Sequence, residues 1–325
     1  MAKTYFKELD VLKGIGICLV VFGHLSLPKD ILKFIHHFTI PLFFFISGFV
    51  FKPKNNFEFI RDKFQRILLP FYIFSTITFL VHYLTNFPSA AIASKDFLIG
   101  TLFGIASHQY LSWNVALWFL PALFFTNVLF NVLDGYSKRN RDLIGFVLCL
   151  MSLLILKERN WTFLPFHVGA ALLMVPFFII GSWLRKHYLK ILEVLYSNNR
   201  VVFVTSILVI LVGISISNFN SGYADVRLHM IGDVFFFYPG AFVTIIGLLL
   251  FARFIKFRLL IWLGLNSLLI MCVHMPLMEF AFKIIKFIPF DDHAYGVLST
   301  TIIILFCVPF VFLINRFFPV ATGIK

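Results

Sequence analysis

Long apolar runs separated by short polar segments dominate the chain from one end to the other. An apolar run of about 20 residues is long enough for a helix to cross the hydrocarbon core of a membrane. About ten runs approach this length, and they lie at residues 9–27, 36–51, 67–86, 117–133, 143–156, 169–184, 201–217, 234–252, 259–282 and 295–314. The pattern therefore predicts an all-α, polytopic bundle of about ten transmembrane helices.

One apolar stretch does not fit the series of spans. Phe97 to Ala106 is too short to cross a bilayer, so we expect it to lie at the interface or to form a re-entrant segment. No cleavable signal pattern, linker or repeat is evident in the sequence. We therefore expect the first span to be retained in the membrane, and residues 1–325 to form a single integral-membrane domain without an appended soluble domain.

Composition and charge strengthen the membrane interpretation. Hydrophobic residues make up 60% of the chain and charged residues only 13%, whereas soluble proteins contain about 25% charged residues. If Met1 is cytoplasmic, most Lys and Arg residues fall in inner segments, and those in the outer loops are Lys29, Lys33, Lys95, Lys157, Arg159, Arg227, Lys283 and Lys286. This bias predicts that both termini are cytoplasmic. It also explains the net charge of +13 without a nucleic-acid partner.

The cysteines give no sign of a disulfide framework or a metal site. They are scattered singly through apolar runs, without disulfide or metal-ligand spacing, as Cys18, Cys149, Cys272 and Cys307. We expect no metal and no permanently bound cofactor.

The first span carries two ionisable residues, Lys13 and His24. Eleven residues at about 100° each bring His24 to within about 20° of Lys13 on a helix, with about 16 Å of rise between them. Ionisable residues in a span usually face a protein interior or a wet cavity. Gly16, Val20 and Gly23 lie near the same stripe, where they either leave room for a slender ligand or, more often, pack against a neighbouring helix.

Histidines form the second candidate feature. Burial in a low dielectric favours a neutral imidazole at His24, which is the state that a general base needs. His36 and His37 open the second span across a short loop. We expect the three imidazoles to gather at one mouth, although each can instead be an ordinary hydrogen-bonded residue at a span end.

The segment KPKNNFEFIRDKFQRILLP, before the third span, is the densest basic patch and contains Lys52, Lys54, Arg61, Lys63 and Arg66. Basic residues at a cytoplasmic span end serve as a topology signal and contact lipid headgroups. Lys63 and Arg66, three residues apart on a helix, can also hold the phosphates of a nucleotide-like ligand. The sequence leaves both interpretations open.

Five segments together resemble the acyltransferase family 3 proteins of bacteria, which are membrane O-acyltransferases that modify cell-surface glycans. They are ELDVLKGIGICLVVFGH, IPLFFFISGF with Pro41, Ser47 and Gly48, KFQRILLP, LWFLPALF around Trp118, and LGLNSLLIMCVHMPL with Asn266, Ser267, His274 and Pro276. The last segment is similar to a late span of the sugar O-acetylase branch.

The resemblance implies an enzyme of the bacterial inner membrane. Acyl-CoA, usually acetyl-CoA, binds from the cytoplasm as a co-substrate, and its acyl group passes to a hydroxyl of a surface polysaccharide or a lipid-linked sugar. The resemblance implies that His24 is catalytic and that Lys13, Lys63 and Arg66 bind acyl-CoA. Two departures are visible: Lys13 and Lys63 replace Arg, which loses bidentate geometry, and Thr39 stands where many sugar O-acetylases have His.

Two mechanisms remain open at this point. In the first, His24 removes the proton of the incoming hydroxyl while a fixed donor, from Asn114, Ser47 or His274, stabilises the oxyanion. In the second, His24 carries the acyl group covalently. The sequence does not distinguish them.

Two competing functions are also open. A glycan transporter or flippase would use His24, His36, His37 and His274 to relay protons or bind sugar, and a catalytically silent scaffold would use none of them. The identity of the acceptor sugar and the oligomeric state are not determined by the sequence.

Overall fold

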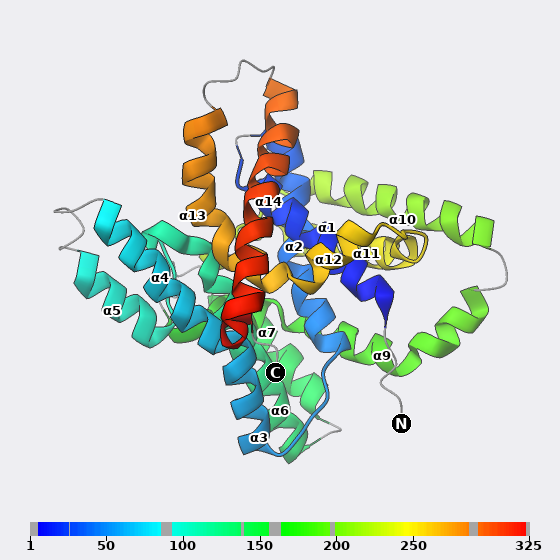
Figure 1. Ribbon diagram of the computed structural model, residues 1–325. Coiled ribbons are helices and arrows are strands. Elements are labelled where there is room, and N and C mark those ends of the chain that lie inside the picture. Colours follow the sequence, from blue (N-terminus) through cyan, green and yellow to red (C-terminus); the bar gives the residue numbers. More distant parts are fainter. Residues whose placement is uncertain are drawn as a thin grey trace.

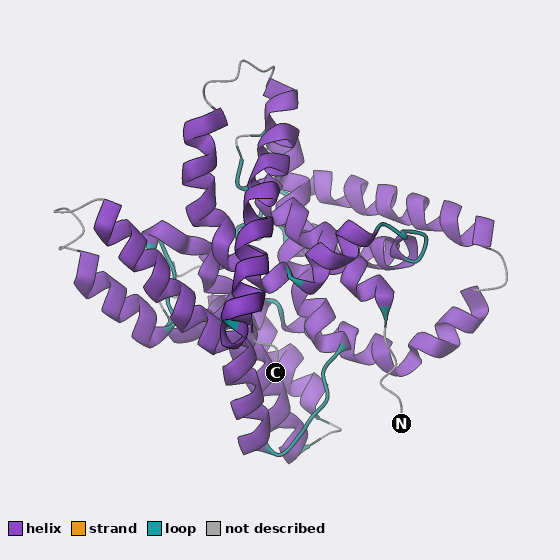
Figure 2. Ribbon diagram, in the orientation of Figure 1, coloured by secondary structure: helices purple, strands orange, loops and turns teal. Residues whose placement is uncertain are grey.

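The computed structural model describes residues 6–25, 27–85, 93–137, 140–155, 164–195, 199–285 and 292–322, and within these ranges it contains helices and loops but no strand (Figure 2). Only an isolated bridge between Asp225 and Met230 has strand-like pairing there. The all-α prediction is therefore confirmed.

Figure 1 shows the arrangement of the helices. In chain order the elements are α1 (Lys7–Gly23), α2 (Lys29–Phe49), α3 (Asn56–Lys63), η1 (Phe64–Leu68), α4 (Leu69–Thr85), α5 (Ala93–Phe103), η3 (Ser112–Trp118), α6 (Phe119–Tyr136), α7 (Arg141–Ile155), η5 (Pro165–His167), α8 (Val168–Leu173), α9 (Val175–Leu195), α10 (Asn199–Phe219), η6 (Val226–Leu228), α11 (Val234–Ala252), α12 (Arg258–Leu265), α13 (Ser267–Ile285), α14 (Asp292–Phe317) and η7 (Pro319–Thr322).

Each of the ten apolar runs coincides with one helix or with consecutive helices. Within the described ranges, six helices are long and apolar enough to cross a membrane, or up to eight if each sharply bent pair forms one span. The other two runs are shorter, with 17 residues in α1 and 15 in α7. The helical polytopic bundle is thus established, whereas the count of ten and the cytoplasmic location of both termini stay predictions.

The short apolar stretch that we expected not to cross belongs to α5. This helix has 11 residues and is therefore only about 16 Å long. It packs against α4, where the rings of Phe79 and Phe97 are stacked with centroids 4.2 Å apart. A turn at Gly104, whose φ is +63°, follows the helix.

Two of the expected spans are bent, by 64° between α8 and α9 and by 84° between α12 and α13. Pro176 follows the first bend and lacks the N–H that would continue the helical bonding. At the second bend, Asn266 donates a hydrogen bond to the Trp262 carbonyl at 2.9 Å. Asn315 of α14 donates to the Asn266 side-chain oxygen at 2.8 Å. Side-chain bonds thus hold the α12–α13 bend in place.

Close helix crossings place α1 among α2, α11, α12, α13 and α14. On the α1–α12 crossing, a Cβ atom on Gly14 would collide with the Leu260 carbonyl, and one on Gly264 would collide with the Asp10 carbonyl. Small residues allow membrane helices to approach this closely. The buried position of α1 matters because its free face forms one wall of a cavity.

Candidate functional site

A cavity of about 480 Å³ runs along one face of α1, a volume within the usual range for ligand sites. From α1 and its two caps it is lined by residues that, apart from the adjacent pair Leu9 and Asp10, are three or four positions apart, namely Phe6, Leu9, Asp10, Lys13, Ile17, Val20 and His24. This is the spacing of a single helix face. The prediction that Lys13 and His24 share one face is confirmed.

The other walls come from three regions and are mainly apolar. They are lined by Ile40, Phe43, Ile46, Ser47 and Val50 of α2, Ala116, Trp118, Phe119, Leu120 and Leu123 of η3 and α6, and Gly264, Leu265, Ser267, Leu268 and Met271 of the α12–α13 region. The glycines near the α1 stripe do not widen the cavity. Gly16 packs against Leu42 and Phe43, and Gly23 packs against Ile35, so packing was the correct alternative for both.

At one end of the cavity, Lys13 forms an ion pair with Asp10. Lys13 Nζ lies 2.6 Å from Asp10 Oδ1, and the two side chains are 28% and 7% exposed. The buried carboxylate balances the ammonium group. An anionic ligand at Lys13 would therefore compete with Asp10.

At the other end, His24 follows the last residue of α1 and acts as its C-cap. Its side chain is accessible from the cavity. The ring beside it is that of His274, with ring centroids 5.2 Å apart and planes at 37°. An imidazole exposed to an apolar cavity, with a second imidazole at its back, is suited to proton transfer.

His274 is completely buried in α13. Its Nδ1 lies 2.8 Å from the Met271 carbonyl oxygen and 3.1 Å from that of Ile270. Since carbonyl oxygens only accept, Nδ1 must be the donor. In a neutral ring, His274 therefore has no free N–H to offer an oxyanion.

Asn114 of η3 compensates for Pro276 in α13, the helix that carries His274. Pro276 has no N–H for the Cys272 carbonyl four residues before it, and Asn114 Nδ2 donates to that carbonyl at 2.8 Å. Asn114 is fully buried and interrupts η3 with φ −151° and ψ 65°. This contact joins η3 to the part of α13 that carries His274.

The expected gathering of His24, His36 and His37 is found only in part, because His36 lies near His24 whereas His37 is directed toward α11. His36 Nε2 lies 3.1 Å from the Gly23 carbonyl oxygen, and His37 Nε2 lies 3.2 Å from the Phe236 carbonyl oxygen of α11. Neither ring lines the cavity. Adjacent residues on a helix point about 100° apart, so His36 and His37 cannot both lie beside His24. The ring in contact with the His24 ring comes from His274 of α13.

Ser47 lies toward the Lys13 end of the cavity, far from His24. Because α2 is antiparallel to α1, Gly23 packs near the beginning of α2 and Gly16 packs against Leu42 further along it. Ser47 is further still, and the helix rise puts it more than about 15 Å from the level of His24. Its oxygen accepts a hydrogen bond from Asn127 Nδ2 at 2.9 Å, a contact that the sequence did not indicate.

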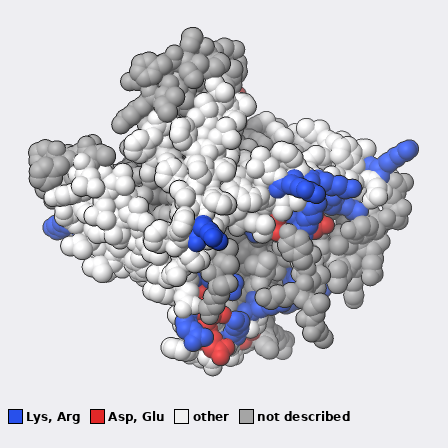
Figure 3. Space-filling view, viewed as in Figure 1, with Lys and Arg blue, Asp and Glu red and all other residues white. Residues whose placement is uncertain are grey.

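The basic segment is separate from the cavity lining. Lys63 ends α3 with its Nζ 5.3 Å from the centre of the Phe59 ring, and the exposed Arg66 lies in η1, a π-helical turn. Arg66 thus follows Lys63 in the adjoining turn, and the two charges lie close enough to interact. Figure 3 shows Lys and Arg side chains gathered at the lower end of the molecule, where α3 lies, and near α10 and α11 (Figure 3).

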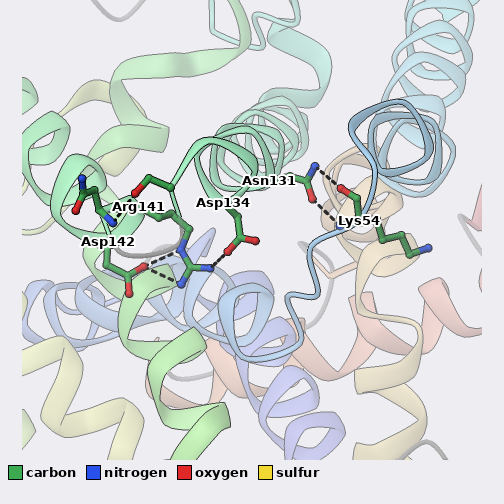
Figure 4. A network of polar contacts seen from close by, with 7 residues as sticks. Lys54, Asn131, Asp134, Arg141 and Asp142 are labelled. Atoms are coloured by element: carbon green, nitrogen blue, oxygen red, sulfur yellow. Dashed lines mark hydrogen bonds and ion pairs between the residues drawn. The ribbon is translucent and has the colours of Figure 1, made fainter.

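A polar network holds the chain before α3 against α6 and α7 (Figure 4). Asn131 accepts from the Lys54 backbone N–H at 2.9 Å and donates to the Lys54 carbonyl at 3.1 Å. Arg141, which is 4% exposed, pairs with Asp134 at 2.7 Å and with Asp142 at 2.8 Å. These bonds are satisfied within the fold, so we assign the network a structural role.

Arg185 of α9 is a cation that the sequence gave no reason to select. Its guanidinium carbon lies 4.2 Å from the centre of the Phe6 ring and 5.6 Å from that of Phe49, an arrangement that stabilises a cation. Phe6 lines the Lys13 end of the cavity. Arg185 makes no ion pair within the described part of the chain, so its charge there is not balanced as that of Lys13 is.

Comparisons with known proteins agree with the resemblance seen in the sequence. A family model described as an acyltransferase domain matches residues 6–316. No curated protein and no solved structure matches the chain. Among the described residues, no group of three or more His, Cys, Asp or Glu side chains is placed to hold a metal ion.

Proposed function

The chain belongs to the acyltransferase 3 family, and from this premise we propose that it moves an acyl group, with acetyl expected, from cytoplasmic acyl-CoA to a hydroxyl of a cell-surface glycan or its lipid-linked precursor. Membership of the family and the apolar helices make the protein a multi-pass membrane protein of an acyltransferase family. The donor, the acceptor and the bacterial inner membrane belong to the proposal.

One observation carries the proposal: a single cavity extends from the Lys13–Asp10 ion pair to an imidazole at His24. The two residues are separated by about 16 Å of helix rise. The thioester of acyl-CoA can thus reach His24 while its phosphates stay near the Lys13 end. The mainly apolar walls suit a thin, uncharged arm between these two groups.

In the proposed reaction, His24 accepts the proton of the acceptor hydroxyl while the hydroxyl oxygen attacks the thioester carbon. The carbon–sulfur bond breaks, an ester bond forms, and His24 returns the proton to the departing thiolate of CoA. Charge develops on the carbonyl oxygen and calls for a donor. Of the three expected donors, His274 has its N–H committed, Ser47 is at the wrong end, and Asn114 Nδ2 donates to the Cys272 carbonyl and does not line the cavity, so the proposal assigns the oxyanion donor to none of them.

Transfer through an acyl-histidine remains a second route for the same residue. His24 would then attack the thioester itself, and the acceptor hydroxyl would displace the acyl group from the imidazole. Rapid mixing of the protein with radiolabelled acetyl-CoA without acceptor distinguishes the routes, because only the covalent one labels the protein. Substitution of His24 abolishes that label.

For the phosphates of CoA we propose that Arg185 and Lys13 form the binding end, with Lys63 and Arg66 as the alternative that the sequence favours. Arg185 is supported by its contact with Phe6 at the cavity. Guanidinium groups bind phosphates bidentately, which an ammonium group cannot do. Lys13 is the weaker member because Asp10 already neutralises it.

The proposed function is tested with the variant His24→Ala. The matched control is His36→Asn, because His36 bonds the backbone of α1 and does not line the cavity. Membranes containing each variant receive radiolabelled acetyl-CoA, and label is measured in the extracted surface polysaccharide and lipid-linked glycan. We expect His24→Ala to lose transfer by at least about 100-fold, the usual effect of removing a general base, while His36→Asn retains it. Full transfer by a correctly inserted His24→Ala protein would overturn the assignment.

The transporter alternative receives less support from the structure. It requires a path of polar groups, but His36 and His37 bind backbone carbonyls away from the cavity. A transporter would also release unmodified glycan and leave acetyl-CoA intact, so the same assay separates the two functions. A silent scaffold would be unaffected by His24→Ala.

A further inference from the structure

A buried hydrogen-bond acceptor beside His24 has no donor. Nδ1 of His274 donates to the Met271 and Ile270 carbonyls, so in the neutral ring Nε2 carries a lone pair. This Nε2 is buried and makes no hydrogen bond in the described part of the chain. Leaving a buried acceptor without a donor destabilises the folded protein, so a hydrogen-bond donor is expected at Nε2.

His24 is the group that can supply the donor. The ring centroids of His24 and His274 are 5.2 Å apart. The edges of the two rings, which carry the nitrogens, are therefore closer than the centroids. A small rotation of the accessible His24 side chain therefore brings an N–H toward Nε2. His274 is completely buried and bound through Nδ1 to its own helix, so His24 is the ring that moves.

We propose that His274 is a positioning residue that accepts a hydrogen bond from one ring N–H of His24 through Nε2, and thereby leaves the other His24 nitrogen unprotonated toward the cavity. The inference rests on the proposed role of His24 as the proton acceptor. Each neutral imidazole has one donor and one acceptor nitrogen. Fixing the donor of His24 on His274 therefore fixes which nitrogen can take the substrate proton.

In this arrangement His274 fixes the tautomer and orientation of His24, as the carboxylate fixes those of the histidine in Ser-His-Asp enzymes. A neutral imidazole is better suited to this apolar place, because a buried unpaired carboxylate would carry a large desolvation cost. His274 keeps its own proton throughout. The hydroxyl proton moves to His24 and then to the thiolate, without crossing to α13.

The surroundings of His274 keep its ring in place. Pro276 removes a helical bond of Cys272, and Asn114 replaces it at 2.8 Å. The segment of α13 around His274 is thus attached to η3 rather than free to bend at the proline. The lone pair of Nε2 consequently has a defined position relative to His24.

Two substitutions distinguish the roles of the two ring nitrogens of His274. His274→Asn keeps a short amide that can donate to the helix carbonyls in place of Nδ1, but it removes the acceptor at the Nε2 position. His274→Gln is longer and places an amide oxygen near the Nε2 position. The pair therefore differs mainly in whether His24 has an acceptor.

The assay uses the full-length protein in membranes, radiolabelled acetyl-CoA and the endogenous glycan fraction. We expect His274→Asn to lower kcat by about 10–100-fold, a range typical of residues that orient a functional histidine, with an unchanged KM for acetyl-CoA. We expect His274→Gln to restore most of kcat. A merely structural role would lower both variants alike or alter the amount of folded protein, which size-exclusion chromatography in detergent measures.

Equal kcat losses in the Asn and Gln variants would overturn the positioning role, as would a fully active His274→Asn protein. The His24→Ala variant is measured in parallel. If it is inactive while His274→Asn is active, the proposed function stands and this inference fails. If His24→Ala is active, the proposed function itself fails.

Discussion

The crossing of α1 and α12 is so close that one added methyl group should separate the helices. An alanine Cβ at Gly264 would overlap the Asp10 carbonyl and the Gly14 backbone nitrogen. Backbone atoms cannot rotate out of the way as a side chain does. Gly264→Ala must therefore push the two helices apart along the wall of the cavity, since Asp10 and Gly264 both line it.

The expected cost follows from two opposing contributions. Alanine gains about 0.5–1 kcal/mol over glycine in a helix, whereas overpacking costs about 1–3 kcal/mol when side chains can adjust. Here the obstacle is backbone, so the upper part of that range applies. We expect Gly264→Ala to lower the free energy of unfolding by about 2 kcal/mol.

Gly135 of α6 offers a matched control, because a Cβ there would meet nothing within 4 Å. Gly135→Ala should raise the free energy of unfolding by about 0.5 kcal/mol. Both variants are measured by thermal unfolding in detergent, followed by circular dichroism of the helices, together with acetyl transfer. A Gly264→Ala protein as stable as the parent would refute the close crossing, and with it the position of Asp10 in the cavity wall.

Two further predictions concern Arg185, which contacts the cavity residue Phe6, and the loop between α10 and α11. Arg185→Ala should raise the KM for acetyl-CoA about 10-fold, the usual loss for a charge-assisted hydrogen bond of about 1.5 kcal/mol. The double variant Lys63→Ala with Arg66→Ala should raise this KM less. A larger rise in the double variant, measured in the same transfer assay, would place the phosphate site at the basic segment instead. Burial lowers the pKa of His229 from its ordinary 6.5 to about 4. The unfolded chain therefore binds this proton at a higher pH than the folded chain does. The free energy of unfolding consequently falls as the pH falls from about 6.5 toward about 4. His229→Gln should flatten this part of the stability profile in thermal unfolding between pH 7 and pH 4, and an unchanged profile would contradict the burial of an uncharged His229.

Much of the cavity wall could be predicted from local periodicity. Lys13 lies in α1 and His24, eleven residues later, caps the end of this regular helix, so helix geometry places them on one face. Lys63 and Arg66, which helical spacing predicts to be neighbours, lie close enough for their charges to interact although Arg66 stands in a π-helical turn. Their binding of phosphates stays a prediction.

The histidines show that closeness along the chain does not by itself predict which side chains contact each other. His36 and His37 are close to His24 along the chain, yet they bind carbonyls of α1 and α11. The ring that contacts His24 belongs to His274, 250 positions away. No periodic signal links those two residues, so only the packing of α13 beside α1 could bring them together. Arg185 was missed for the same reason, since its contact with Phe6 joins α9 to the beginning of α1.

The sequence by itself determined the helical membrane bundle, the family and the face of α1 that lines the cavity. Hydrophobic runs and helical spacing act over neighbouring residues, so they can be read from one segment at a time. The tertiary structure decided which imidazole contacts His24, which cation contacts the Phe6 ring and which nitrogen of His274 makes no hydrogen bond in the described part of the chain. These depend on close contacts between distant helices and on individual hydrogen bonds, which the order of residues along a single span does not specify.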